Sequence, residues 1–140
     1  MNVPVGFVLQ ELVPPDVFGL LGDKAIRLID PNVLAILAQI RADYGPLIVN
    51  NWHTGGQFKW RGFRPMNCPE GAPKSMHKEG KAIDCHSPRI AVEQMRREVI
   101  AKAKTRHPIY SLIGGIEDGV TWLHFDTRTR VNDQLLVFRS

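Results

Sequence analysis

Two stretches of the chain repeat apolar residues at the spacing of an amphipathic helix. The first follows Asp30-Pro31, which supply an N-cap carboxylate and a proline at the first helical position, and it ends at Gly45. The second begins at Ser87-Pro88 and runs to about Arg106, with basic residues in its last turns that complement the helix dipole. A shorter amphipathic helix, weakened by glycines, is predicted between residues 14 and 30.

Short apolar runs bounded by turn residues predict strands in much of the remaining chain. Asp118-Gly119 is expected to form the tight turn of a hairpin. Helices followed by antiparallel strands, with one helix crossing between them, predict a single α+β domain over residues 1–140, in which helices pack on one side of an antiparallel sheet. The expected strands span residues 46–50, 80–86, 109–117, 120–126 and 135–138.

Residues 51–80 show neither the period of a helix nor that of a strand, and they are rich in glycine, proline and polar residues. A loop of this length within a compact domain is usually functional. Trp52 and Trp60 in this loop are candidates either for the floor of a glycan or peptide groove or for anchors that hold the loop to the core.

The composition is that of a globular protein. Of the 140 residues, 44% are hydrophobic and 23% are charged, which argues against a disordered chain or a coiled coil. The longest apolar run, residues 33–38, is far shorter than the ~20 residues that a membrane span needs. Cys68 and Cys85 stand in no C-x-x-C spacing and are expected to be free thiols.

The formal net charge of +4 comes from lysines and arginines spread along the chain rather than gathered in one block. We therefore expect no nucleic-acid partner, although this charge favours attraction to an anionic polymer such as a bacterial cell wall. The N-terminal residues have no basic segment before an apolar run, so no secretory signal is expected. The chain is expected to be made in a cytoplasm and to act as a monomer.

Strand alternation turns two candidate metal ligands away from the core. In the strand expected after the long loop, Ile83 belongs in the core, so Asp84 faces the opposite side of the sheet. In a later strand, the apolar neighbours Leu123 and Phe125 belong in the core, so His124 also faces away from it. His77 lies at the end of the long loop, just before the first of these strands.

Two imidazoles and one carboxylate leave the fourth tetrahedral position of a zinc ion to water, as in catalytic zinc sites. The alternative is that His77, Asp84 and His124 are ordinary hydrogen-bonding residues on the surface. Spacing alone leaves both interpretations open.

Three motifs resemble one family. S-M-H-K-E-G-K-A-I-D, residues 75–84, resembles the S-x-H-x-x-G-x-A-x-D signature of the zinc D-Ala-D-Ala carboxypeptidase family, which has the hedgehog/D,D-peptidase fold. W-L-H-F-D, residues 122–126, resembles its second motif, and R-G-F-R, residues 61–64, is similar to its S-G-[FY]-R. The order of helices, strands and motifs from Pro31 to Arg128 also matches that family.

This resemblance implies one zinc ion per chain, with His77, Asp84 and His124 as ligands and Arg64 as a clamp on a substrate carboxylate or carbonyl. It implies a zinc peptidase that hydrolyses an amide in the stem peptides or cross-links of peptidoglycan, as a D,D-carboxypeptidase or an endopeptidase. Short members without a signal are typical of phages, where they serve as endolysins or other wall-processing enzymes. Such an enzyme acts at the cell wall after release or as part of the virion.

The general base is where the sequence departs from the family. Members place an acid three residues before the last histidine or a histidine five before it, and here those positions hold Thr121 and Gly119. This departure favours the alternative of a weak or inactive relative that binds the wall, or sits in a virion, without cleaving. Asp126 is favoured for orienting a ligand. The candidates for the base are Glu117, Asp118, His86 and Asp126, with the two hairpin acids first.

Overall fold

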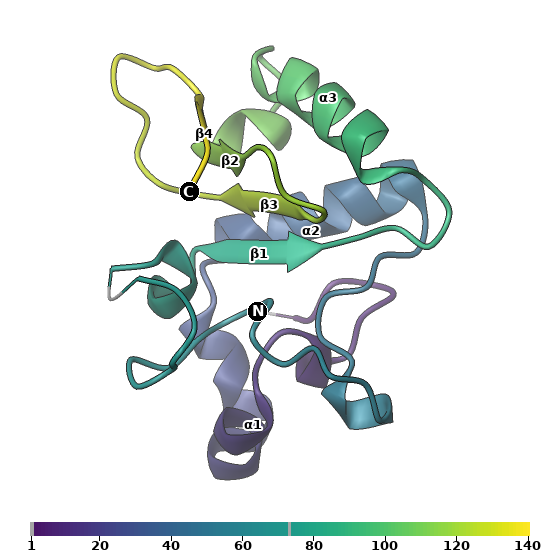
Figure 1. The fold of residues 1–140 in the computed structure, drawn as a ribbon, viewed down its shortest axis with the longest axis vertical. Helices are drawn as coiled ribbons and strands as arrows, with labels where there is room; N and C mark the ends of the chain where they lie inside the picture. The colour runs from purple at the N-terminus through teal and green to yellow at the C-terminus, as the bar shows by residue number, and fades with distance from the viewer. Residues whose placement is uncertain (1, 73) are drawn as a thin grey trace.

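The computed structural model describes residues 2–72 and 74–140. The elements of this part of the chain lie in the order that Figure 1 shows, with several 3-10 turns between them. The α-helices are α1 (Pro15–Leu21), α2 (Pro31–Tyr44) and α3 (Val92–Ala103), and the strands are β1 (Ala82–Cys85), β2 (Gly115–Glu117), β3 (Leu123–Asp126) and β4 (Leu136–Phe138). None of the described helices is long and apolar enough to cross a bilayer.

Helix α2 has the ends that the sequence predicts. The Asp30 carboxylate accepts a hydrogen bond from the backbone N–H of Asn32 at 2.9 Å, and Gly45 ends the helix with a φ of 83°. Helix α3 instead begins later than predicted, at Val92. The Ser87 hydroxyl accepts hydrogen bonds from the two amides that follow Pro88, both at 3.0 Å, which holds this segment in a turn rather than a helix.

The sheet is mixed, so the prediction of a purely antiparallel sheet was wrong. Its strand order is β1-β3-β2-β4; β3 pairs antiparallel with both of its neighbours, whereas β2 and β4 are parallel. The chain reverses after β3 at Asn132 and Asp133, whose φ angles of 53° and 58° suit a tight turn, and then passes beyond β2. Strand β4 therefore runs opposite to β3 and parallel to β2.

Two other predicted strands were also wrong in extent. Residues 46–50 contribute only an isolated bridge between Ile48 and His86. Residues 110–112 form a 3-10 turn, because the ring of His107 accepts hydrogen bonds from the amides of Ile109 and Tyr110 at 3.1 Å and fixes that turn. The tight turn predicted at Asp118-Gly119 is a wider loop, since β2 ends at Glu117 and β3 begins only at Leu123.

One face of the sheet packs into the apolar core and the other carries the charged residues. Ile83, Ile116 and Phe125 lie in one buried cluster with the apolar side chains of α2 and α3, and Figure 1 shows α2 behind β1 and β3. Burying this apolar area supplies the main stabilisation of the fold. The opposite face is also withdrawn from water, and its charged residues are buried. They are Asp84, Glu117, His124 and Asp126, and the buried His77 of a neighbouring 3-10 turn lies beside them.

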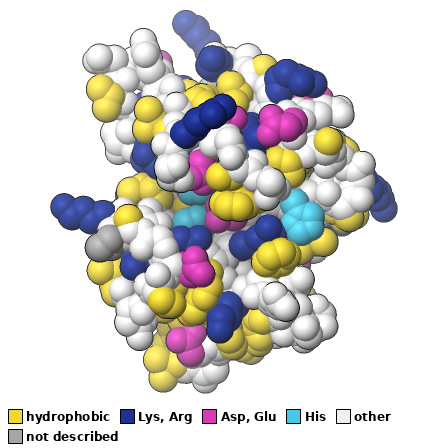
Figure 2. Space-filling model, in the orientation of Figure 1, with side chains coloured by type: hydrophobic (Ala, Val, Ile, Leu, Met, Phe, Trp, Pro, Cys, Tyr) yellow, Lys and Arg dark blue, Asp and Glu magenta, His cyan; other side chains and the backbone are white. Residues whose placement is uncertain are grey.

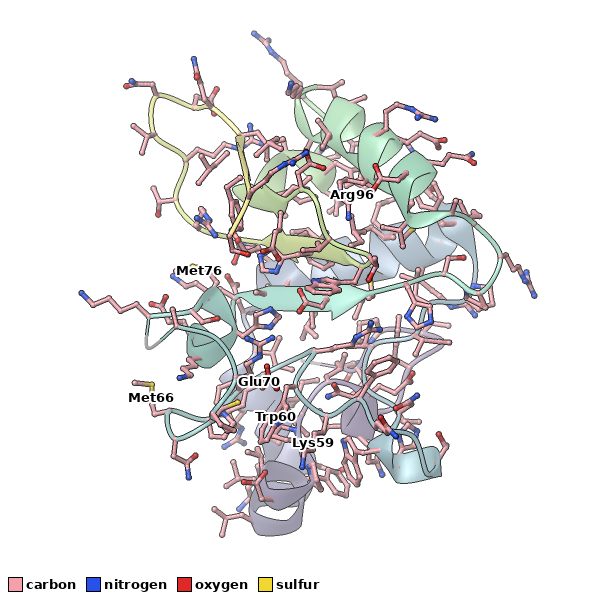
Figure 3. The ribbon with its side chains drawn as sticks, in the orientation of Figure 1. Lys59, Trp60, Met66, Glu70, Met76 and Arg96 are labelled. Carbon is pink, nitrogen blue, oxygen red and sulfur yellow. The ribbon has the colours of Figure 1, made fainter. Side chains whose placement is uncertain are left out.

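Arg96 ties helix α3 to the loop between β2 and β3. Its side chain is only 2% exposed, and its guanidinium donates to the backbone carbonyls of Val120 at 2.5 Å and Trp122 at 2.7 Å. Glu93, one turn earlier on the helix, balances its charge. Figure 3 labels Arg96 on α3, at the side of the helix that faces the sheet. The arginine thus fixes the path of the chain into β3.

We expect Arg96→Met to lower the free energy of unfolding by about 3 kcal/mol, because two buried carbonyls lose charged donors. Denaturant unfolding measures this loss. Arg97→Met is the matched control, since Arg97 is exposed on the same helix and its loss is expected to change stability by less than about 0.5 kcal/mol. Equal stability of the two variants would contradict the role of Arg96.

Candidate metal centre

The structure brings His77, Asp84 and His124 together. His77 lies in the 3-10 turn Met76–Glu79, which the Ser75 hydroxyl caps by accepting from the His77 N–H at 3.2 Å. Asp84 on β1 is directly opposite His124 on β3. Asp84 Oδ1 lies 3.2 Å from His77 Nε2 and 2.8 Å from His124 Nδ1. One ligand atom from each residue falls within 4.8 Å of the others, so the three form a single cluster.

Each imidazole is oriented by a hydrogen bond on the side away from Asp84. His77 Nδ1 donates to the backbone carbonyl of Gly62 at 2.9 Å, which leaves Nε2 free to accept a metal. His124 Nε2 lies 2.9 Å from the carboxylate of Asp126, which is fully buried and is held in turn by Arg128. His124 therefore turns Nδ1 toward Asp84 and the cluster, and Asp126 takes the orienting role favoured for it from the sequence.

The charges of the cluster depend on one another. Burial disfavours the Asp84 carboxylate, yet the charges and hydrogen bonds of His77 and His124 hold the pKa of Asp84 well below its usual value. Burial also disfavours a charged His124, but hydrogen bonds to Asp126 and Asp84 outweigh it and raise the pKa of His124 to about 9. The two carboxylates thus stabilise positive charge between them, whether a proton or a metal ion carries it.

The donor set fits a divalent metal ion. Two imidazole nitrogens and one carboxylate oxygen converge, and the residues are 3% exposed at His77, 5% at Asp84 and 7% at His124. Nitrogen and oxygen ligands in this ratio suit transition metals such as zinc, and three protein ligands leave a position open for a substrate or water. The cluster could therefore hold a metal ion at the floor of the site.

The cluster opens into a cavity of about 400 Å³, and the cavity separates the two hairpin acids. Glu117 pairs with His124 across β2 and β3, so its side chain shares the face of the cluster and lines the cavity. Asp118 points the other way, where its carboxylate lies 3.4 Å from Arg139 and 3.8 Å from Arg96. Of the two acids weighed as the base, the structure brings only Glu117 to the cluster.

Arg64 also lines the cavity and contacts the cluster. Its Nε donates to the carbonyl of Trp60 at 2.6 Å, and its Nη2 lies 3.5 Å from Asp84 Oδ2. The guanidinium therefore lies beside the ligands with N–H groups left to face the cavity. Its role as a clamp on a substrate carbonyl or carboxylate stays a prediction.

The remaining candidates lie outside the cavity. The indole N–H of Trp52 donates to the carbonyl of Val13 at 2.9 Å, so this tryptophan anchors the long loop to the core. Trp60 and His86 do not line the cavity. Both cysteines are buried free thiols, as predicted, and burial raises the pKa of Cys85 to about 12.

Three parts of the site have no motif in the sequence that predicts them. The Gly62 carbonyl orients His77, but a backbone oxygen leaves no residue signature. Arg128 holds Asp126 with two hydrogen bonds to its carboxylate. The hydroxyl of Ser140 donates to Glu117 and thereby closes one side of the cavity. For the second of these parts, the spacing of two residues between Asp126 and Arg128 could have indicated an ion pair, because such residues share one face of a strand.

Comparisons with protein-family models, with curated proteins and with solved structures found no match for this chain. Its function has to be inferred from the residues of the site.

We expect protein purified without chelator to bind one divalent metal ion per chain, and His77→Ala, Asp84→Ala and His124→Ala each to remove most of it, because two ligands hold such an ion weakly. Elemental analysis of the purified protein measures the stoichiometry. His53→Ala is the control, since His53 is exposed and away from the cluster. Full metal content in all three ligand variants would refute the assignment.

Proposed function

We propose that this chain is a zinc-dependent peptidase that hydrolyses an amide bond in the stem peptides or cross-links of bacterial peptidoglycan. The observation that carries the proposal is the convergence of the buried His77, Asp84 and His124 with Glu117 and Arg64 at one cavity. A metal-ligand set, an acid and a cation at one cavity are the groups that amide hydrolysis needs.

Zinc is the metal that these donors favour. Its catalytic sites use three protein ligands drawn from histidine and acidic residues, whereas calcium and magnesium prefer oxygen ligands alone. The hydrogen bonds from His77 to Gly62 and from His124 to Asp126 are of the kind that fix ligating histidines and raise their basicity. When bound, zinc would polarise the scissile carbonyl and make an attacking water more acidic.

The roles of the protein groups follow from their places. Glu117 faces the cavity from the strand next to His124, so it accepts a proton from the attacking water and passes it to the leaving amine. Arg64 donates to the substrate carbonyl or to a terminal carboxylate, and it stabilises the negative charge that develops on the carbonyl oxygen. Asp126 keeps His124 in the orientation in which Nδ1 faces the site.

The substrate class rests on the resemblance of three motifs to the D-Ala-D-Ala carboxypeptidase family. Residues 61–64, 75–84 and 122–126 carry that resemblance, and they supply Arg64 and the three ligands. The net charge of +4 suits an anionic wall polymer. We place the enzyme at the bacterial cell wall as a monomer, after release from the cell or as part of a virion.

A second candidate function is a module that binds the wall without cleaving it. The observation that favours it is Thr121 at the position where the family carries an acid, so that catalysis depends on a Glu117 already bonded to Ser140. Both functions involve binding of wall peptides, but only the peptidase generates new termini.

Incubation of the zinc-loaded protein with purified peptidoglycan fragments tests the proposal. The peptidase is expected to release shorter peptides with new amine and carboxyl ends, identified by mass spectrometry, and a chelator is expected to stop the release. Added zinc is then expected to restore it. Binding to peptidoglycan with no release of peptides would favour the non-cleaving module instead.

We expect Glu117→Gln to reduce kcat by at least ~100-fold, because the amide cannot accept the proton that the carboxylate takes. Zinc content and melting temperature are expected to remain close to those of the unmodified protein, since Glu117 is not among the three ligands. Asp118→Asn is the matched control and is expected to keep near-normal turnover, because Asp118 points away from the cavity. Equal losses in the two variants would show that Glu117 is not the base.

A further inference from the structure

A second arginine, Arg61, lies beside the cluster without an acidic partner. Its guanidinium stacks over the ring of Phe58, with Cζ 3.7 Å from the ring centroid, and its Nη1 lies 2.7 Å from His86 Nδ1. Across residues 2–72 and 74–140, no carboxylate lies within ion-pair distance of it. Partial burial lowers the pKa of Arg61, because the charged form loses hydration there. An anion from outside the chain would stabilise the charged guanidinium in place of the lost hydration.

The pair formed by Arg61 and His86 offers donors only. Arginine has no acceptor atom, so its Nη1–H must donate to His86 Nδ1. The hydrogen of a neutral His86 ring is then on Nε2, which becomes a donor as well. The other guanidinium N–H groups of Arg61 have no acceptor among the described hydrogen bonds. A flat cation with an adjacent N–H donor is suited to a carboxylate, which has two oxygens in one plane.

This pair is held in a fixed position next to the metal ligands. The backbone carbonyl of Arg61 accepts from the N–H of Asp84 at 2.8 Å, and its own N–H donates to the side chain of the buried Asn50 at 2.9 Å. His86 follows Asp84 by two residues on the same side of the chain, which spaces them by about 7 Å. Figure 2 shows histidine and basic side chains gathered along the middle of this face, at the level of β1.

We propose that Arg61 and His86, with Phe58 as a wall, form a subsite that binds a free carboxylate on a residue about two positions along an extended peptide from the amide at the metal centre. The proposal rests on the proposed peptidase function for the identity of its ligand. A spacing of about 7 Å matches two residues of an extended peptide, so one peptide reaches both places. Peptidoglycan stems contain such a group, because glutamate linked through its side chain leaves its α-carboxylate free.

Two peptides that differ only in this carboxylate test the subsite. They are L-Ala-γ-D-Glu-L-Lys-D-Ala-D-Ala and the same peptide with the glutamate α-carboxylate converted to an amide. We expect the zinc-loaded enzyme to show a kcat/KM at least ~10-fold higher for the acid than for the amide, the scale of one charge-assisted contact. Equal kcat/KM values for the two peptides would overturn the proposal.

Arg61→Met is expected to abolish this preference, so that kcat/KM becomes equal for the acid and the amide peptide, because the variant loses the charged contact to the carboxylate. Arg61→Lys is expected to keep part of the preference through its charge. The control is Lys59→Met, which removes a positive charge two residues away; Lys59 is exposed and Figure 3 shows it well apart from β1. Retention of the full preference in Arg61→Met would overturn the subsite.

Binding of glutarate separates this subsite from the peptidase function. Glutarate is expected to shift the NMR resonance of the Arg61 Nε–H in the unmodified protein, whereas the neutral glutaric diamide is expected to leave it unchanged. If no peptide is cut but glutarate shifts this resonance, the peptidase proposal fails and the anion site stands. If peptides are cut and glutarate leaves the resonance unchanged, the subsite fails and the peptidase proposal stands.

Discussion

The site depends on the register of β1 against β3. Asp84 lies opposite His124 only because Ile83 lies opposite Phe125, and both of these apolar side chains are fully buried in the core. A slip of one residue would move the carboxylate into the core and the isoleucine to the site, at a large cost in free energy. The hydrophobic alternation that folds the sheet therefore also aligns Asp84 and His124, two of the candidate metal ligands.

The site face concentrates buried charge in a small volume, and two of its carboxylates are stabilised by neighbours of opposite sign. Asp84 lies between two imidazoles and Arg64, and Asp126 between His124 and Arg128. Such groups contribute little net stability, because desolvation cancels much of their attraction. A bound cation adds the positive charge that these carboxylates favour, so metal binding and folding are expected to be thermodynamically linked.

Strand alternation was enough to predict the face of the sheet on which Asp84 and His124 lie. Their apolar neighbours must face the core, and in a strand the next residue then faces the opposite side. The N-terminal cap of α2 at Asp30 was also predicted from neighbouring residues alone, and the structure confirms it. The sequence could not predict which of Glu117 and Asp118 faces the cavity. That depends on where β2 ends and on how Arg96, in a helix distant in sequence, holds the loop that follows β2. The parallel pairing of β4 likewise follows from a long-range path that no local pattern encodes.

The segment 61–64 connects the candidate metal ligands with the two arginines proposed to bind substrate. Its carbonyls accept from Asp84 N–H and His77 Nδ1, and its last N–H donates to the His77 carbonyl at 3.1 Å, so it lies against both β1 and the 3-10 turn that carries His77. A Cβ at Gly62 would lie 2.2 Å from the Leu12 carbonyl oxygen, so only glycine allows this approach. The first and last residues of the segment carry the guanidinium groups that contact His86 and Asp84. The geometry that orients a metal ligand thereby also fixes the two cations proposed to hold the substrate, and a shift of this backbone would disturb both together.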